Sequence, residues 1–130
     1  MKVNKITFYA ALLTAGGVAL GAFGAHALKE TLLVHGTTET WKTAVFYQLI
    51  HGLAAWAALS GATRHSPLLV KSAFAWLIGI FLFSGSLYGL SLGGPRWLGP
   101  ITPLGGLAFI VGWLIAARAA WINSSSTADD

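Results

Sequence analysis

The sequence predicts an all-α integral membrane protein, a four-helix bundle with short loops and one short interfacial helix between the first two spans. Of its 130 residues, 55% are apolar and 9% are charged, which is too little charge to cover a water-soluble surface of this size. Four apolar stretches are long enough to cross a bilayer. Small residues recur at every fourth position in three of them, as in helices that pack closely in lipid.

The first predicted span covers residues 6–26. Its apolar run contains no charged residue and, at about 1.5 Å per residue, is long enough to cross the hydrocarbon. The end of this run, Ala25-His26-Ala27, also resembles the cleavage site of a secretory signal whose charged start would be the two lysines near the N-terminus. Because the run is longer than the core of a typical cleaved signal, we expect it to remain as a membrane helix.

A short helix is expected next. The stretch LKETLLVH, residues 28–35, has leucines on one side of a helical turn and charged residues on the other, which predicts a helix lying on the membrane surface. Gly36 is expected to break the chain after it. Thr37 or Thr38 can then cap the following helix, whose first turn holds Glu39.

The remaining predicted spans cover residues 41–62, 72–92 and 98–117, with prolines near the positions where helices begin or end. Residues 1–121 therefore form a single four-span domain. The polar residues that follow, 122–130, cannot bury enough apolar surface to order themselves, so they are predicted to form a disordered tail.

Basic residues in the short loops predict the orientation. If both termini are cytoplasmic, that side carries five basic residues and the opposite side three: Lys2, Lys5, Arg64, Lys71 and Arg118 against Lys29, Lys42 and Arg96. Since lysine and arginine are retained in the cytoplasm, this bias predicts both termini inside. The same residues are too scattered to bind nucleic acid. The absence of cysteine excludes disulfides, thiolate metal sites and thiol catalysis.

Small residues spaced four apart predict helix-packing faces, because they let helix backbones approach closely in lipid. The residues are Gly17, Gly21 and Ala25 in the first span, Gly85, Gly89 and Gly93 in the third, and Ala108, Gly112 and Ala116 in the fourth. The spacing does not distinguish a face within one bundle from a face between two copies. A homo-oligomer or a larger membrane complex is therefore expected among the partners, besides membrane lipids.

Polar side chains gather on one face of the second and third spans. On the second span a polar residue recurs at every fourth position from Glu39 to His51. The antiparallel third span brings its own polar face to the same depth, in the half of the bundle away from the termini, whereas the other half is nearly all apolar. This asymmetry predicts a polar pocket entered from the non-cytoplasmic side. The ligand-pocket candidates are His26, Tyr47, Gln48, His51, Ser84, Ser86 and Tyr88.

Each candidate also has a structural interpretation. A histidine within a span is costly and therefore a functional candidate. A neutral His51 hydrogen-bonded to Gln48, Tyr88 or a backbone carbonyl would instead join helices. His26, near the membrane boundary, is expected to form hydrogen bonds at a helix end. Serines in helices can donate to a carbonyl one turn back, so no catalytic residue is assigned, and no metal site is expected.

A family resemblance is carried by four segments, GAFGAHAL, TAVFYQLIHGLA, FLFSGSLYGLSL and RWLGPITPLGGLAFIVGW. In order and spacing they resemble the family of small four-span membrane proteins known as domain of unknown function 423, which includes animal transmembrane protein 256. The resemblance extends from Gly16 to Trp113. It implies four helices, a first span that is retained, and a bacterial inner-membrane or mitochondrial location. It implies no activity.

Three functions are weighed. We expect a non-enzymatic protein of the bacterial inner membrane that binds a lipid or small amphiphile, or serves as an accessory subunit of a membrane complex. One alternative is a redox subunit in which His26 and His51 hold a haem or line a quinone site. Their depths differ by about 9 Å, which disfavours haem more than quinone. The other alternative is a channel or carrier, for which the spans offer no clearly intramembrane charge.

Overall fold

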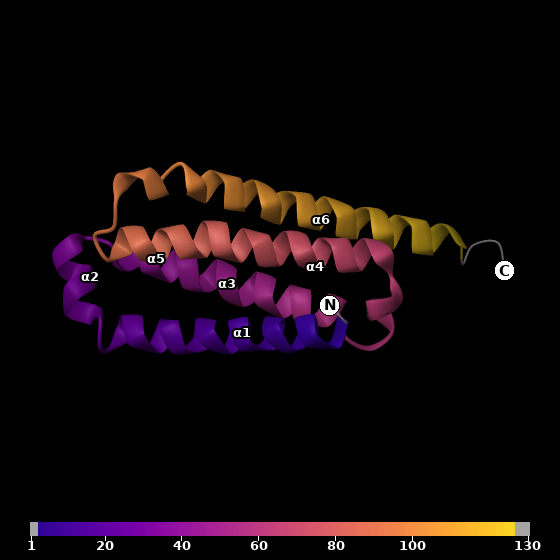
Figure 1. Cartoon of the computed structure of the whole chain (residues 1–130), viewed down its shortest axis with the longest axis horizontal. Helices are drawn as coiled ribbons and strands as arrows, with labels where there is room; N and C mark the ends of the chain where they lie inside the picture. The colour runs from indigo at the N-terminus through magenta and orange to yellow at the C-terminus, as the bar shows by residue number, and fades with distance from the viewer. Residues whose placement is uncertain (1–2, 127–130) are drawn as a thin grey trace.

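The computed structural model describes residues 3–126, and they form an all-α protein with four long helical segments side by side (Figure 1). The first is α1 (Val3–Ala25) and the second is α3 (Thr38–Ala58). The third is continuous through α4 (Pro67–Gly79), the π-helical segment η2 (Ile80–Ser84) and α5 (Gly85–Ser91), and the fourth is α6 (Ile101–Ser126). The predicted all-α membrane bundle is confirmed.

Short helices connect these segments. The interfacial helix predicted between the first two spans is α2 (Lys29–His35), and Gly36 ends it with φ of 65°, a left-handed conformation that glycine adopts without strain. Two 3₁₀ helices, η1 (Gly61–His65) and η3 (Arg96–Leu98), form the other two connections. Both termini lie toward the end of the bundle that holds η1, and α2 lies at the opposite end (Figure 1).

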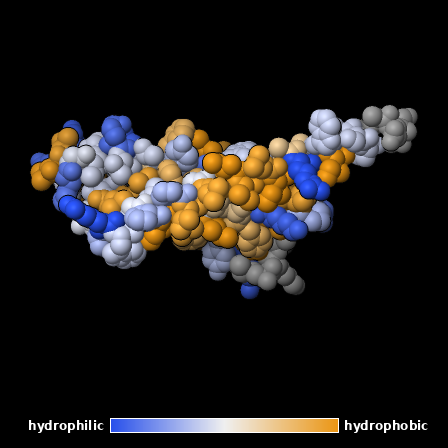
Figure 2. Space-filling model, turned by 90° about the horizontal axis from the view of Figure 1, so that it is seen from above, coloured by the Kyte–Doolittle hydropathy of each residue, from blue (hydrophilic) through white to orange (hydrophobic). Residues whose placement is uncertain are grey.

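Three of the long helical segments are long and apolar enough to cross a membrane: Lys5–Ala25, Pro67–Ser91 and Arg96–Ser126. The more polar α3 is not among them, although it has a comparable length of 21 residues. It lies between α1 and the α4–α5 segment and packs against both (Figure 1). Its buried polar side chains, Gln48 and His51, face neighbouring helices, whereas those of its first two turns, such as Glu39 and Lys42, are exposed. The space-filling view has an apolar middle, with hydrophilic residues concentrated toward the two ends (Figure 2).

The core lies where α1, α3 and α4 meet near the end that holds the termini. Three alanines, Ala10, Ala55 and Ala73, are fully buried there with no exposed surface. Small side chains allow the three helix backbones to approach closely, which is the main source of helix association in lipid. The fourth segment, α6, packs against α4 and η2 on the other side.

Two predicted boundaries are corrected. The helix predicted over residues 41–62 is α3, which ends at Ala58 because Gly61, with φ of 57°, begins the 3₁₀ turn of η1. Residues 122–126, predicted as part of a disordered tail, extend α6 instead. Serine hydroxyls support this last turn by donating to the carbonyl oxygens of Trp121 and Asn123. The remaining tail residues, 127–130, lie outside the described residues.

Three of the predicted helix-packing residues, Gly17, Gly21 and Gly112, lie opposite side chains of neighbouring helices. A methyl group added at Gly17 would come within 2.9 Å of Leu49 on α3, and one at Gly21 within 3.3 Å of Val45. On α6, a methyl group at Gly112 would come within 2.5 Å of the Trp76 indole. These glycines are therefore sites of close helix approach. Ala25 is exposed, and Ala108 is half-buried.

The three glycines predicted to form a helix-packing face on the third span, Gly85, Gly89 and Gly93, do not form one. Gly85 is exposed and has no neighbour within 4 Å of an added methyl group. Gly89 faces Leu98 of η3, and Gly93 lies beyond the end of α5 with φ of 83°. The spacing does not give a continuous helix face because α5 ends at Ser91, and Gly93 therefore lies in a turn.

Candidate functional site

The helix α3 takes part in most of the hydrogen bonds that join the long helices. Gln48, which is 4% exposed, donates from Nε2 to the carbonyl oxygen of Leu13 on α1 over 2.7 Å. Its Oε1 accepts a 2.6 Å hydrogen bond from the hydroxyl of Tyr88 on α5. One amide side chain thus links α1, α3 and α5. Hydrogen bonds of this kind join helices where no water is present to compete.

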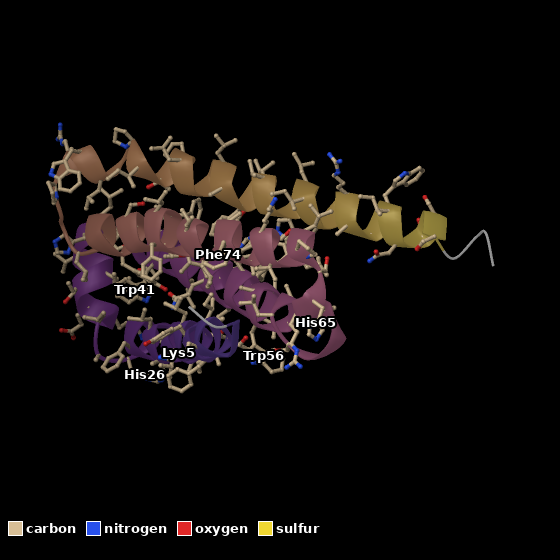
Figure 3. The ribbon with its side chains drawn as sticks, turned by 45° about the vertical axis from the view of Figure 1, so that its right-hand side comes forward. Lys5, His26, Trp41, Trp56, His65 and Phe74 are labelled. Atoms are coloured by element: carbon tan, nitrogen blue, oxygen red, sulfur yellow. The ribbon has the colours of Figure 1, made fainter. Side chains whose placement is uncertain are left out.

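Trp41 adds a second link at the α2 end of the bundle. Its indole Nε1 donates to the carbonyl oxygen of Leu20 over 2.9 Å, and its ring lies 4.7 Å from that of Tyr88. The indole fits between α1 and α5 (Figure 3) because Gly24 has no side chain at the point of contact. Gly24, which the spacing of small residues does not single out, is therefore a packing residue for α3.

The serine candidates are engaged in contacts of their own. Ser84, fully buried at the end of η2, donates across to the carbonyl oxygen of Ala44 on α3 over 2.7 Å. Ser86 lies 2.6 Å from the Thr102 hydroxyl of α6 and donates to the carbonyl oxygen of Phe83 over 2.9 Å. Since serine has one O–H, Thr102 is the donor in the contact between the two hydroxyls. Both serines therefore hold helices together.

The segment η2 occupies a central position among these contacts. Gly85 N donates to Ile80 O, five residues earlier, which is the π-helical pattern. A methyl group added at Gly105 of α6 would collide with the backbone of Phe83, so α6 approaches closely here. Such π segments occur frequently at functional sites. Here the segment brings Ser84 to α3 and Phe83 to α6.

His51 faces α6. Its Nδ1 lies 2.8 Å from the carbonyl oxygen of Tyr47, one turn back, and its Nε2 accepts a 3.1 Å hydrogen bond from the indole of Trp113. A carbonyl only accepts and an indole N–H only donates, so these partners select a neutral imidazole with the proton on Nδ1. The imidazole also stacks on the Phe109 ring at 3.6 Å. Both ring nitrogens are engaged.

His26 lies apart from the other candidates. It is exposed beside the end of α1 and lies at the edge of the molecule (Figure 3). Its neighbours in the shallow depression there are Ala19, Ala22 and Phe23 of α1 and Ala27. It does not share a site with His51, which is buried against α6.

Five of the predicted candidates therefore fall into two groups with different partner helices. Gln48, Ser84 and Tyr88 join α3 to α1 and α5, whereas His51 and Tyr47 contact α6. The predicted single pocket that includes His51, open toward the α2 end, is not formed by the described residues. Gln48 and His51 are three residues apart and point only about 60° apart around α3, but the neighbouring helices meet along this face, so the two side chains reach different partners.

Two large grooves open sideways instead. The α1–α4 groove has a volume of about 650 Å³, lies between α1 and the α4–η2 segment, and is bordered by Gln48. The α3–α6 groove has a volume of about 680 Å³ and is lined by aromatic rings together with His51. Ligand pockets commonly have volumes of about 300 to 1,000 Å³. Both grooves are of that size, and aliphatic and aromatic side chains line most of their surface.

Sequence reasoning missed the partners on α6. Phe109 and Trp113 lie four residues apart on one helical face, which is a sequence signal for a shared contact surface. Gly79 opposes the Phe109 ring, and Gly112 opposes the Trp76 indole, so these glycines mark where aromatic rings insert. The useful pattern is a glycine on one helix paired with a large ring on another. A single sequence does not reveal which ring meets which glycine.

Together, these features define a multi-pass helical membrane protein whose interior polar side chains connect its helices. The chain belongs to the family described as "Protein of unknown function (DUF423)", whose profile matches residues 20–106. It is 38% identical to a UPF0382 membrane protein of Haemophilus influenzae over 94% of this chain and 98% of that one. It is 43% identical to UPF0382 membrane protein YwdK of Bacillus subtilis over 79% and 85% of the two chains.

A further relative is a UPF0382 membrane protein of Schizosaccharomyces pombe, 38% identical over 80% of this chain and 91% of its own. The family predicted from the four sequence segments is confirmed, as is the membrane class. No solved structure matches the chain significantly.

Proposed function

We propose that this protein is a non-enzymatic component of the bacterial inner membrane that binds the acyl chain of a lipid or similar amphiphile in its lateral grooves. The observation that carries the proposal is the α1–α4 groove. It opens sideways from an apolar helix surface, has a volume of about 650 Å³, and is lined almost wholly by aliphatic and aromatic side chains. An acyl chain is the ligand that such a surface accommodates without leaving polar groups unpaired.

The absence of enzymatic activity is supported by the state of the interior polar groups. Gln48, Ser84, Ser86 and Tyr88 all have hydrogen-bond partners within the bundle. Among the described residues, none of the buried side chains is a carboxylate, lysine or arginine. An enzyme needs an acid, base or nucleophile that can reach substrate. These four groups are engaged within the bundle, and the two buried polar atoms without a hydrogen-bond partner in the described part of the chain, Ser91 Oγ and Trp76 Nε1, belong to neither an acid nor a base.

The redox alternative receives less support. Haem ligation by two histidines requires both rings on opposite faces of one iron. His26 is exposed beside α1, and both nitrogens of His51 are engaged by Tyr47 and Trp113. A channel or carrier receives little support either, since no charged residue is buried among the described residues.

We also propose that both termini are cytoplasmic. The end of the bundle that holds the termini carries Lys5, Arg64, Lys71 and Arg118, and the α2 end carries Lys29, Lys42 and Arg96. Lys2 lies outside the described residues, and by its position in the sequence it is counted with the first group. The bias agrees with retention of basic residues in the cytoplasm.

Retention of lipid in native mass spectrometry tests the acyl-chain proposal. Gly16 lines the α1–α4 groove, and a methyl group added there would make only an ordinary contact of 3.6 Å with Gln48. Gly16→Leu should fill the groove and reduce the number of retained lipid molecules. Gly85→Leu is the matched control, because Gly85 is exposed and has no neighbour within 4 Å of an added methyl group. Wild-type protein that retains no lipid would refute the proposal.

A further inference from the structure

A third groove lies at the α2 end of the bundle, between the end of α1, α2 and the first half of α3. Its volume is about 390 Å³, and we refer to it as the α2 groove. Its lining combines Gly24, Trp41, Val45 and Leu49 with the basic residues Lys29 and Lys42. The groove therefore differs from the other two, because two cationic side chains border an otherwise apolar surface.

The charges lie at one end of the α2 groove. Lys29 is the first residue of α2, and Lys42 lies in the second turn of α3, so both belong to the α2 end, one of the two ends where hydrophilic residues are concentrated (Figure 2). Leu49 lies seven residues beyond Lys42 on the same helix, which is about 10 Å deeper. A ligand in the groove would therefore meet cations at the membrane boundary and apolar side chains below it.

This order of contacts matches that of a phospholipid. We infer that the α2 groove holds a phospholipid of net negative charge, with its phosphate between Lys29 and Lys42 and an acyl chain along Val45 and Leu49. The inference rests on the proposed binding of acyl chains and adds the headgroup class. Lysine is a point-charge donor that suits a phosphate oxygen. Each lysine near an anionic membrane surface contributes an attraction of about 1 kcal/mol.

The nearby carboxylates do not cancel this attraction. Glu39 pairs with Lys42 at 3.0 Å, but both side chains are exposed, at 84% and 68%. An exposed pair of this kind is weak and exchanges readily for a better anion. Glu30, the other carboxylate on this part of the chain, is exposed on α2, and neither glutamate lines the groove. Thr38, which is half-buried, is a further polar residue of the lining.

A competition experiment tests the inference. Purified protein is offered equal amounts of phosphatidylglycerol and phosphatidylcholine with identical acyl chains, and the ratio of bound lipids is read by native mass spectrometry. Wild-type protein should prefer phosphatidylglycerol by roughly fivefold to thirtyfold, since one to two lysine contacts contribute. The Lys29→Gln, Lys42→Gln double variant should bring the ratio close to one. The Lys29→Arg, Lys42→Arg double variant should keep the preference.

Two further variants make the test specific. Glu39→Gln releases Lys42 from its ion pair and should raise the preference for phosphatidylglycerol. Lys5→Gln with Lys71→Gln removes two exposed charges at the opposite end and should leave the ratio within about twofold of wild type. If this control lowers the preference as much as the loss of Lys29 and Lys42 does, the inference is overturned, because attraction by net charge alone would then explain the preference.

The outcomes separate the two proposals. If wild-type protein retains both lipids equally, acyl-chain binding stands and the anionic headgroup site is refuted. If it retains neither lipid, the proposed function itself fails. If the preference survives loss of Lys29 and Lys42 together, the headgroup lies elsewhere and the α2 groove is not the site.

Discussion

The indole of Trp41 occupies the space where a side chain at Gly24 would lie, and from there its Nε1 donates to the carbonyl oxygen of Leu20. One glycine thus permits an interhelical hydrogen bond and an aromatic contact with Tyr88 at 4.7 Å. The same arrangement of a large ring against a glycine recurs between Trp76 and Gly112. It is found again between Phe109 and Gly79.

Gly24→Ala should destabilise the protein. The new methyl group would displace the Trp41 indole and break its hydrogen bond to Leu20, so we expect a loss of about 1 to 3 kcal/mol, as for other overpacked sites. Unfolding in mixed detergent micelles, followed by circular dichroism, measures it. Gly85→Ala is the control and should lose no stability, since nothing lies near that position. Equal stability of the two variants would contradict the proposed role of Gly24.

Gln48 and Tyr88 should be energetically coupled. Tyr88→Phe removes the hydroxyl that donates to Gln48 Oε1 over 2.6 Å, and Gln48→Leu removes the acceptor together with the bond to Leu13. Hydrogen bonds between membrane helices contribute about 0.6 to 2 kcal/mol. A double-mutant cycle should therefore give a coupling free energy in that range. Strictly additive effects would mean that the two side chains do not interact in the membrane.

His51→Leu should lower stability through α6. The change removes the acceptor of the Trp113 indole and the stacking on Phe109 at 3.6 Å. We expect a loss of about 1 to 3 kcal/mol because a partly buried hydrogen bond and a ring contact disappear together. Trp113→Phe introduced into the His51→Leu variant should then lower the free energy of unfolding only a little further. A large additional loss would show that Trp113 acts independently of His51.

Single cysteines test the orientation, since the chain has none of its own. Cysteines at Ser66 and Ser125 should be protected from an impermeant thiol reagent in intact cells, whereas one at His35, in α2 at the opposite end, should react. The expectation follows from the excess of basic residues at the end that carries the termini. Reaction at Ser66 in intact cells would reverse the topology.

The sequence by itself determined the fold class and the family. Its apolar stretches are long enough to span a bilayer, and their length and composition carry that information without reference to neighbours. It also predicted α2 and its end at Gly36, where a left-handed residue is a local requirement. The close-packing roles of Gly17 and Gly112 followed from spacing. The predicted face from Gly85 to Gly93 failed, because spacing does not reveal where a helix stops.

Only the tertiary structure decided how the polar side chains are used. Gln48 and His51 are three residues apart on α3, yet Gln48 joins α1 to α5 and His51 joins α3 to α6. Which neighbour a helix face meets depends on how all four helices are arranged, and the period of one helix does not contain that information. The grooves arise in the same way, because each is formed by side chains from two or three helices that are distant in the sequence.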